Sequence, residues 1–263
     1  MGTLETTADL GRDVDLRLSR LRRFNLLMGF LHLGQGIAML LLANDFALPV
    51  KSSFLRFDAG RDRLLPDPET LFRVRVGPLV AAFLFLSAVA HLVLASLGYK
   101  WYRRNLLKGI NPARWIEYSA SSSLMIVVIA MLVGIYDIAA LIVLFALNAC
   151  MVLFGWMMEL HNQTTVRTNW TSYWFGVFAG AVPWVAIGLH LFGAHSSPPT
   201  FVYWIYGSIF VFFNVFAMNM VLQYRKVGRW RDYLYGERAY VILSLVAKSL
   251  LAWQVFAGTL RPA

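Results

Sequence analysis

The last apolar run of the chain, residues 240–256, constrains the fold more than any other stretch. It is long enough to cross the ~30 Å hydrocarbon core of a bilayer as a helix, yet it carries Lys248 near its centre. A lysine at that depth costs roughly 2.5–3.5 kcal/mol on insertion scales. Three compensations are open to it: a carboxylate partner, loss of its proton, or conversion of the amine into a Schiff base.

Composition indicates a membrane protein with several spans. Of the 263 residues, 59% are hydrophobic and 14% are charged, and the mean hydropathy is +0.59, far from the values of a soluble domain. We therefore predict an all-α membrane protein, a bundle of seven transmembrane helices of about 20 residues each. The predicted spans are residues 24–43, 77–97, 114–135, 138–157, 174–194, 201–223 and 237–258.

The segments outside these spans divide the chain into three parts. Residues 1–23 are predicted to form a short surface helix leading into the membrane, because apolar residues recur at helical spacing between arginines. Residues 24–258 form the transmembrane domain, in which the connection 44–76 is an ordered or semi-ordered cap outside the bilayer. Residues 259–263 form a C-terminal tail.

Lysine and arginine asymmetry predicts the orientation. Fourteen of these residues lie on the side of the N-terminus, in residues 1–23, 98–113, 158–173 and 224–236, and seven lie on the other side. Cytoplasmic loops carry the excess of positive charge. We therefore expect a multi-pass protein of the cell membrane with a cytoplasmic N-terminus and an extracellular C-terminus.

Several function classes lack support in the sequence. The formal net charge is +10, but the basic residues cluster in loops beside the spans and no nucleic-acid motif is present, so no nucleic-acid partner is expected. No zinc-protease motif, P-loop or nucleophile elbow occurs. We therefore predict no metal site, no catalytic residue and no enzymatic activity.

Four costly side chains fall at one depth of the predicted bundle. Counted along their helices, His32 lies about 12 Å, His91 about 9 Å and Lys248 about 16 Å from the N-terminal side, and Glu117 lies in the same half of its span. The Lys248 side chain also leans toward the start of its helix, which brings its amine nearer to the other three. A shared site explains this coincidence better than four independent accidents.

Helical spacing gives each of these residues a polar neighbour on the same face. The pairs are His32 with Gln35, Ser87 with His91, Glu117 with Ser121, and Ser244 with Lys248. Glu117 is the natural counterion for Lys248, with a local pair to Arg114 as the alternative. For each histidine, a hydrogen-bonded packing role stands beside proton exchange. Glu159 is placed at a span end and Glu237 at the interface, which leaves Glu117 as the well-placed intramembrane carboxylate.

Seven spans with a lysine in the middle of the last one resemble a microbial rhodopsin. Particular segments resemble the heliorhodopsins, and the likeness covers nearly the whole chain. These segments are Ala43–Pro49, Arg114–Ser123, Phe154–Trp156, Gly236–Tyr240 and Ser244–Ser249.

The resemblance implies all-trans retinal bound to Lys248 as a protonated Schiff base, with Glu117 as its counterion. It implies that His32 and His91 line a polar, proton-accepting cavity. To this cavity we assign Gln35 as well, because it shares a helix face with His32. The other polar residues that the resemblance places around the site are Ser87, Ser121, Asn148 and Ser244. The implied retinal contacts are Met151, Gly155, Trp174, Phe178, Trp184, Phe213 and Trp253.

The expected function is that of a light-sensing photoreceptor with a slow photocycle. It would signal to a cytoplasmic partner without net ion pumping, and the resemblance implies a homodimer with residues 44–76 in the contact. A light-driven proton transporter or channel is the first alternative, because intramembrane ionisable residues mark ion pathways. The others are a light-gated regulatory subunit of a soluble enzyme or transporter, and a lipid-binding or scaffold protein without retinal.

Overall fold

Seven helices in the described ranges are long and apolar enough to cross a membrane. The computed structural model describes residues 7–193 and 197–261, with side chains from residue 12 onward. The spans are α1 (Thr7–Leu42), α2 (Val76–Ala95), α4 (Pro112–Leu132), α5 (Ile138–His161), α6 (Thr171–Leu191), α7 (Thr200–Tyr224) and α8 (Tyr233–Val255). This confirms the predicted seven-helix all-α membrane fold, although the predicted end of the fifth span, at residue 194, falls outside the described residues.

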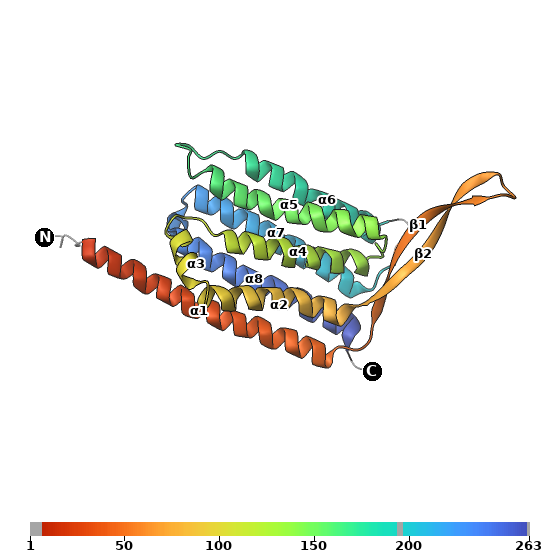
Figure 1. The fold of residues 1–263 in the computed structure, drawn as a ribbon, viewed down its shortest axis with the longest axis horizontal. Helices are drawn as coiled ribbons and strands as arrows, with labels where there is room; N and C mark the ends of the chain where they lie inside the picture. The colour runs from red at the N-terminus through yellow and green to blue at the C-terminus, as the bar shows by residue number, and fades with distance from the viewer. Residues whose placement is uncertain (1–6, 194–196, 262–263) are drawn as a thin grey trace.

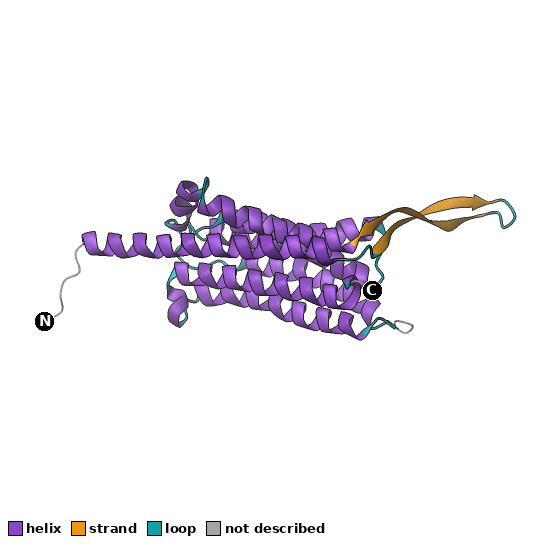
Figure 2. Cartoon of the chain, turned by 90° about the horizontal axis from the view of Figure 1, so that it is seen from below, coloured by secondary structure: helices purple, strands orange, loops and turns teal. Residues whose placement is uncertain are grey.

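The seven spans lie side by side along the length of the molecule, with the chain termini at opposite ends (Figure 1). Each of the first spans packs against the next, α7 packs against α8, and α8 also contacts α1. Helix α1 extends past the other helices where the chain begins (Figure 2). We call that end of the bundle the N-side and the opposite end the C-side.

Capping side chains set where three of the spans begin. Asn111 accepts a hydrogen bond from the Arg114 backbone N–H at 3.2 Å, and the Asp137 side chain accepts one from Ala140 at 3.0 Å. The Asp232 side chain caps α8 in the same way. Such caps satisfy backbone N–H groups that have no partner within the helix. They thereby fix the start of α4 and α8, which carry Glu117 and Lys248.

The segments between the spans hold more structure than the sequence predicts. Residues 7–42 form one continuous helix of 36 residues, not a surface helix followed by a span; no proline interrupts them. The connection 98–113 contains helix α3 (Tyr99–Leu106). A 3₁₀ turn, η1 (Gly228–Arg231), precedes α8, and a π-helical turn, η2 (Phe256–Leu260), continues it.

The predicted cap between the first two spans is a long β-hairpin. Strands β1 (Ala47–Asp58) and β2 (Arg63–Arg75) pair antiparallel and project beyond the C-side end (Figure 1). The sequence did not predict strands because β2 contains two prolines. In a two-stranded ribbon both strands are edges, so a proline can point its missing donor outward.

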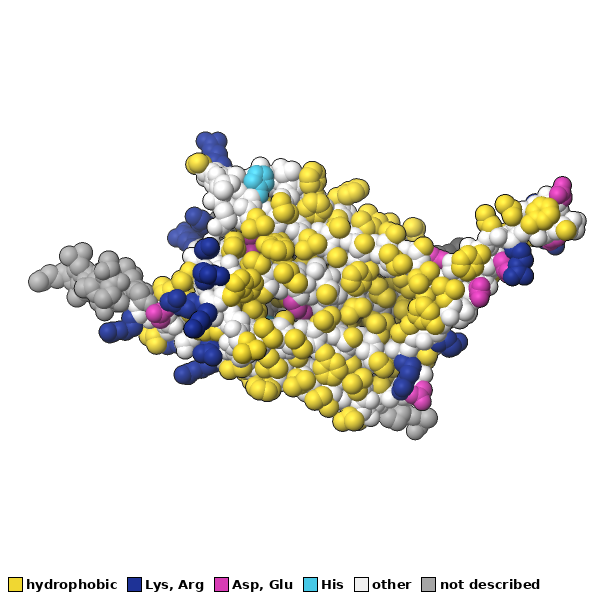
Figure 3. Space-filling view, viewed as in Figure 1, with side chains coloured by type: hydrophobic (Ala, Val, Ile, Leu, Met, Phe, Trp, Pro, Cys, Tyr) yellow, Lys and Arg dark blue, Asp and Glu magenta, His cyan; other side chains and the backbone are white. Residues whose placement is uncertain are grey.

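The two ends of the bundle core differ in composition. Toward the C-side the core is apolar, and Phe83, Leu84, Ile126, Ile129 and Leu251 are each 0% exposed. Buried polar and charged side chains lie from the middle of the bundle toward the N-side. On the outside, hydrophobic side chains cover the middle of the visible face, and lysines and arginines gather at the N-side end (Figure 3).

Candidate functional site

A buried ion pair joins the last span to α4. The Nζ atom of Lys248 donates a hydrogen bond to Oε1 of Glu117 at 2.8 Å, and the two side chains are 4% and 9% exposed. Lys248 also donates to the Ser244 hydroxyl at 2.9 Å, and the Ser87 hydroxyl donates to Glu117 at 2.6 Å. Glu117 therefore pairs with Lys248, as the depth argument predicts, and the alternative pair with Arg114 is not formed. The amine also lies 5.0 Å from the Tyr118 ring centroid, a cation–π contact.

Two histidines lie together between α1 and α2. The rings of His32 and His91 are stacked, with centroids 5.7 Å apart and planes inclined by 7°. His91 Nδ1 is 2.7 Å from Oδ1 of Asn25. The ring nitrogens of His32 are buried and have no hydrogen-bond partner among the described residues. Because buried polar atoms in folded proteins are normally paired, this imidazole is a site where a proton or water can bind.

Some residues predicted for the polar cavity are placed elsewhere. Gln35 accepts a hydrogen bond from Nε1 of Trp253 at 3.1 Å and does not turn toward the histidines. Asn148 is buried, but its amide donates to Ser122 and Ser123 of α4. Of the four residues predicted for this cavity, His32 and His91 therefore lie together, and Asn25 joins them through His91.

The predicted retinal contacts divide into an inner and an outer group. Trp184 is 5% exposed, belongs to the same core as Ala247 and Leu251, and packs edge-on against Phe213 with centroids 5.4 Å apart. Trp253, Trp174 and Phe178 face outward, with 37%, 63% and 76% of their surface exposed. Contact of these three with a buried chromophore is not supported, because their helices turn them away from the core.

Met151 and Gly155 lie on the inward face of α5. A Cβ at Gly180 of α6 would overlap the Met151 side chain, and one at Gly155 would overlap the Trp115 ring. Both glycines therefore allow close contact between neighbouring spans. Ser121 is fully buried one turn beyond Glu117 on α4, and its hydroxyl has no hydrogen-bond partner among the described residues.

A second buried charge cluster on the N-side was not predicted. Arg114 pairs with Glu159 at 2.5 Å and also with Glu237, and all three side chains are at most 4% exposed. The guanidinium carbon lies 4.0 Å from the ring centroid of Tyr240 and 4.3 Å from that of Trp115. Glu159 lies near the end of α5, as predicted, but its side chain is buried. The prediction that Glu237 lies at the interface was wrong, because its side chain is 0% exposed.

Helical spacing contains signals for these missed residues. Glu237 precedes Lys248 by about three helical turns, and Asn25 precedes His32 by about two, so each shares a face with a residue that was predicted. Asn25 lies at the edge of its predicted span, and Glu237 lies beside an arginine that is a natural surface partner. A position near the span end predicts that both side chains are exposed. The helix face on which each residue lies decides instead that both are buried.

Seven membrane spans with one buried lysine–carboxylate pair on the last span are the arrangement of the retinal-binding microbial rhodopsins. The family model for heliorhodopsins matches residues 21–260. The chain therefore belongs to the heliorhodopsin family and is a multi-pass membrane photoreceptor of the rhodopsin type. No individual curated protein matches it. Heliorhodopsins are not a classical enzyme family, and the described residues contain no group of side chains arranged to hold a metal ion.

The residues around Lys248 fit a retinal chromophore. A primary amine can form the covalent link, and a carboxylate 2.8 Å away can balance a positive charge on the same nitrogen. Ser87 and Ser244 hydrogen-bond the pair, while Trp184 and Phe213 belong to the apolar core that includes Ala247 and Leu251. The lysine thus lies at a boundary between polar and apolar surroundings, which suits a long hydrocarbon with one charged end.

Proposed function

We propose that the protein senses light through all-trans retinal bound at Nζ of Lys248. In this proposal it passes through a slow photocycle and signals to a partner without net ion pumping. The observation that carries the proposal is the difference between the two sides of the site. Between Lys248 and the C-side end, residues 249–260 of the last span and its neighbours 33–42, 76–86 and 122–132 contain no Asp, Glu, Lys or Arg.

When bound, retinal supplies light absorption and photoisomerisation. The Glu117 carboxylate then holds the positive charge on the Lys248 nitrogen, and the hydroxyls of Ser87 and Ser244 hold the two groups in position. After illumination the proton on this nitrogen moves to Glu117 and the polar groups on the N-side of the site, among which are His32 and His91. A proton held there cannot reach the C-side end, because the apolar core offers it no acceptor.

The arrangement of surface charge supports an N-side that faces the cytoplasm. Lysines and arginines gather at that end of the bundle (Figure 3), and the positive-inside rule relates such an excess to the cytoplasmic face. In this orientation the signalling partner binds the illuminated state on the cytoplasmic side.

A measurement of light-driven pH change tests the absence of pumping. Cells or sealed vesicles containing the retinal-loaded protein are illuminated in weakly buffered medium, with and without an uncoupler. We expect no sustained pH change that the uncoupler abolishes. A robust change of this kind, lost in Glu117→Gln, would establish transport instead.

A light-driven proton transporter is the second candidate. The buried carboxylates of Glu159 and Glu237 favour it, because they add proton-binding groups beyond Glu117. Both lie on the N-side, so a transporter would still need a route through the apolar C-side core. Photocurrents across a voltage-clamped membrane that disappear in Glu117→Gln would support this candidate.

We propose two protein partners, a second copy of this chain and a cytoplasmic signalling protein, from the family resemblance and the surface composition. The hairpin exposes Phe54, Leu55, Phe57 and Leu64 by more than half of their surface, which suits its proposed place in a homodimer contact. The basic segments 98–113 and 224–236 could dock an acidic signalling protein, or a soluble enzyme or transporter under light control. Co-purification from native membranes in light and in darkness tests the second partner.

A further inference from the structure

The N-side cluster carries more negative than positive charge. When ionised, Glu159 and Glu237 supply two negative charges against the single positive charge of Arg114, and all three side chains are buried. One uncompensated charge in such surroundings is expensive, and one added proton removes it. The ionisable side chains packed around the cluster are Tyr118 on α4, Tyr233 and Tyr240 on α8, Tyr102 on α3, and His91 on α2.

The hydrogen bonds distinguish the two carboxylates. Glu159 accepts from Arg114, from Tyr233 at 3.1 Å, from the Asn111 backbone at 2.9 Å and from Trp115 at 2.6 Å. Four donors therefore hydrogen-bond its two oxygens. Glu237 accepts one hydrogen bond, from the Asn111 amide at 2.8 Å, and its Oε1 is in ion-pair contact with Arg114. With two partners against the four of Glu159, Glu237 is the less strongly stabilised of the two carboxylates, and protonation costs it less.

A small cavity connects Glu237 with the Lys248–Glu117 pair. It has a volume of about 20 Å³ and is lined by both carboxylates, together with His91, Asn25 and Val241. A polar cavity above roughly 10–15 Å³ can hold one water molecule. Because both carboxylates line this cavity, water held in it can pass a proton from one glutamate to the other.

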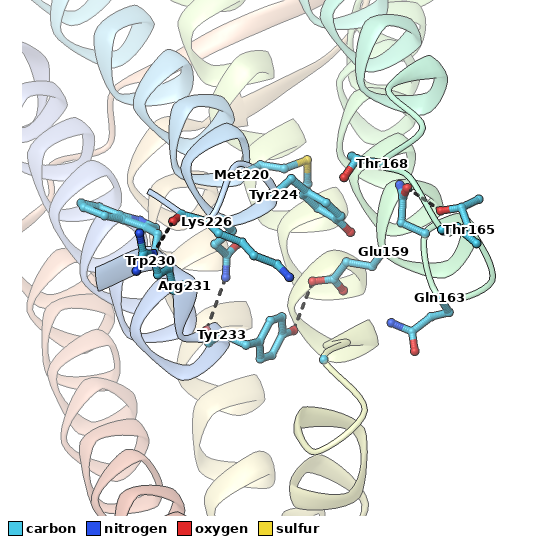
Figure 4. Close-up of a pocket in the computed structure, with 14 residues that line it drawn as sticks. Glu159, Gln163, Thr165, Thr168, Met220, Tyr224, Lys226, Trp230, Arg231 and Tyr233 are labelled. Carbon is cyan, nitrogen blue, oxygen red and sulfur yellow. Dashed lines mark hydrogen bonds between the residues drawn. The ribbon is translucent and has the colours of Figure 1, made fainter. Parts of the chain in front are cut away.

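The other side of the cluster is reached from the N-side surface. An open pocket of about 320 Å³ is lined by Glu159, Tyr233 and Tyr224, with Lys226 at its rim. Glu159 points into this pocket and accepts the hydrogen bond of Tyr233 (Figure 4). The cluster thus lies between the Lys248–Glu117 pair and N-side solvent.

We propose that Glu237 is a second proton-binding site, loaded after illumination and held on the N-side by Arg114 and Glu159. The N–H bond at Nζ of Lys248 breaks, Glu117 and the small cavity pass the proton on, and a new O–H bond forms on the Glu237 carboxylate. The net charge of the cluster rises from minus one to zero, and Nζ loses its positive charge. This inference rests on the proposed retinal photochemistry at Lys248.

Light-minus-dark infrared difference spectroscopy tests the site. We expect a positive carboxylic-acid C=O band that appears with the long-lived illuminated state in the wild-type pigment. The band should be lost in Glu237→Gln and kept in Glu69→Gln, which makes the same change on the exposed hairpin. A positive band that persists in Glu237→Gln, or a negative band assigned to Glu237, would overturn the proposal.

A second pair of variants tests the route without altering an ionisable group. Val241 is 6% exposed and lines the small cavity, so Val241→Ile adds one methylene where the bridging water would lie. The band should then rise more slowly, on the order of tenfold, while Val241→Ala should leave it as fast as wild type or faster. Equal rates in all three proteins would contradict the route, and these variants carry the test if Glu237→Gln fails to fold.

The absorption spectrum separates failure of this inference from failure of the proposed function. A wild-type protein that forms no visible pigment with retinal would remove the photochemistry itself. A pigment that forms normally but lacks the Glu237-dependent band would remove only the second proton-binding site.

Discussion

The N-side and the C-side of this bundle bury opposite kinds of side chain. The N-side buries Arg114, Glu159 and Glu237 beside the Lys248–Glu117 pair, and each of these charges has an opposite charge in contact. The C-side buries aliphatic and aromatic side chains, several of them 0% exposed. The site lies where the two regions meet.

The two regions differ in what their burial contributes to stability. Buried ion pairs contribute little net stability, because desolvation offsets much of their attraction. An apolar core would have been a sufficient scaffold at both ends. We therefore infer that the charges on the N-side bind and transfer protons. The C-side core prevents protons from crossing to the other end of the bundle.

A charge placed in the C-side core should have the largest effect. Ile129 is 0% exposed, and Ile129→Lys would bury an ammonium within the apolar core. We expect a loss of about 3–5 kcal/mol, seen as a much lower Tm in detergent or as failure to fold. Ile129→Leu, which conserves volume, should cost less than about 1.5 kcal/mol. A lysine variant as stable as wild type would show that the C-side core admits water.

Removal of the N-side cation should be nearly as costly. Arg114→Gln leaves Glu159 and Glu237 buried without their partner, and we expect a loss of about 3–5 kcal/mol in thermal unfolding. The matched control is Arg103→Gln, because Arg103 pairs with Asp15 at the surface, where the side chains are 42% and 61% exposed. That pair should contribute about 0–1 kcal/mol. Equal effects of the two substitutions would argue against a tightly buried cluster.

Thermal unfolding measured over a pH series tests how well the N-side of the bundle excludes solvent. Burial raises the pKa of Tyr102 from its usual 10 to about 12, so the folded protein keeps this proton more firmly than the unfolded chain. Stability should therefore fall as pH rises from 10 to 12, by at most about 2–3 kcal/mol from this group. Tyr102→Phe should remove that part of the alkaline loss of Tm. The control variant Tyr203→Phe should keep the full alkaline loss of Tm, because Tyr203 is 38% exposed. A pH profile of Tm that is unchanged in Tyr102→Phe would contradict the burial of Tyr102.

The smallest effect is expected from one hydrogen bond at the site. Ser87→Ala removes the hydroxyl that donates to Glu117 at 2.6 Å, which should cost about 1 kcal/mol and shift the absorption maximum of the pigment. Ser208→Ala on α7 removes a hydroxyl that bonds the Trp204 carbonyl and should leave the maximum unchanged. No shift in Ser87→Ala would mean that this serine does not tune the counterion.

The sequence predicts the spans and the central ion pair because both follow from simple costs. Apolar runs must match the bilayer thickness, and a lysine inside one needs a carboxylate at the same depth, which singles out Glu117. The stacked histidines follow from the same count of depth along α1 and α2. These predictions need only the length of each helix and the direction in which it runs.

The remainder depends on how the helices are rotated against one another. Gln35 lies three residues from His32, yet it bonds Trp253 at the α1–α8 contact, because one turn also moves a side chain around the helix. Glu237 lies beside Arg238 near a span end, but only its inward face makes it a partner of Arg114. The hairpin escaped prediction because its prolines hide the strand pattern. Rotation and pairing are tertiary properties, and spacing alone leaves them open.

The most direct test of the account is a visible absorption spectrum after all-trans retinal is added to purified apoprotein. We expect a band well to the red of free retinal in the wild type, no such band in Lys248→Ala, and a displaced maximum in Glu117→Gln. A folded wild-type protein that forms no such band, or a Lys248→Ala variant that forms the same one, would contradict the assignment of Lys248 and Glu117 as the chromophore site.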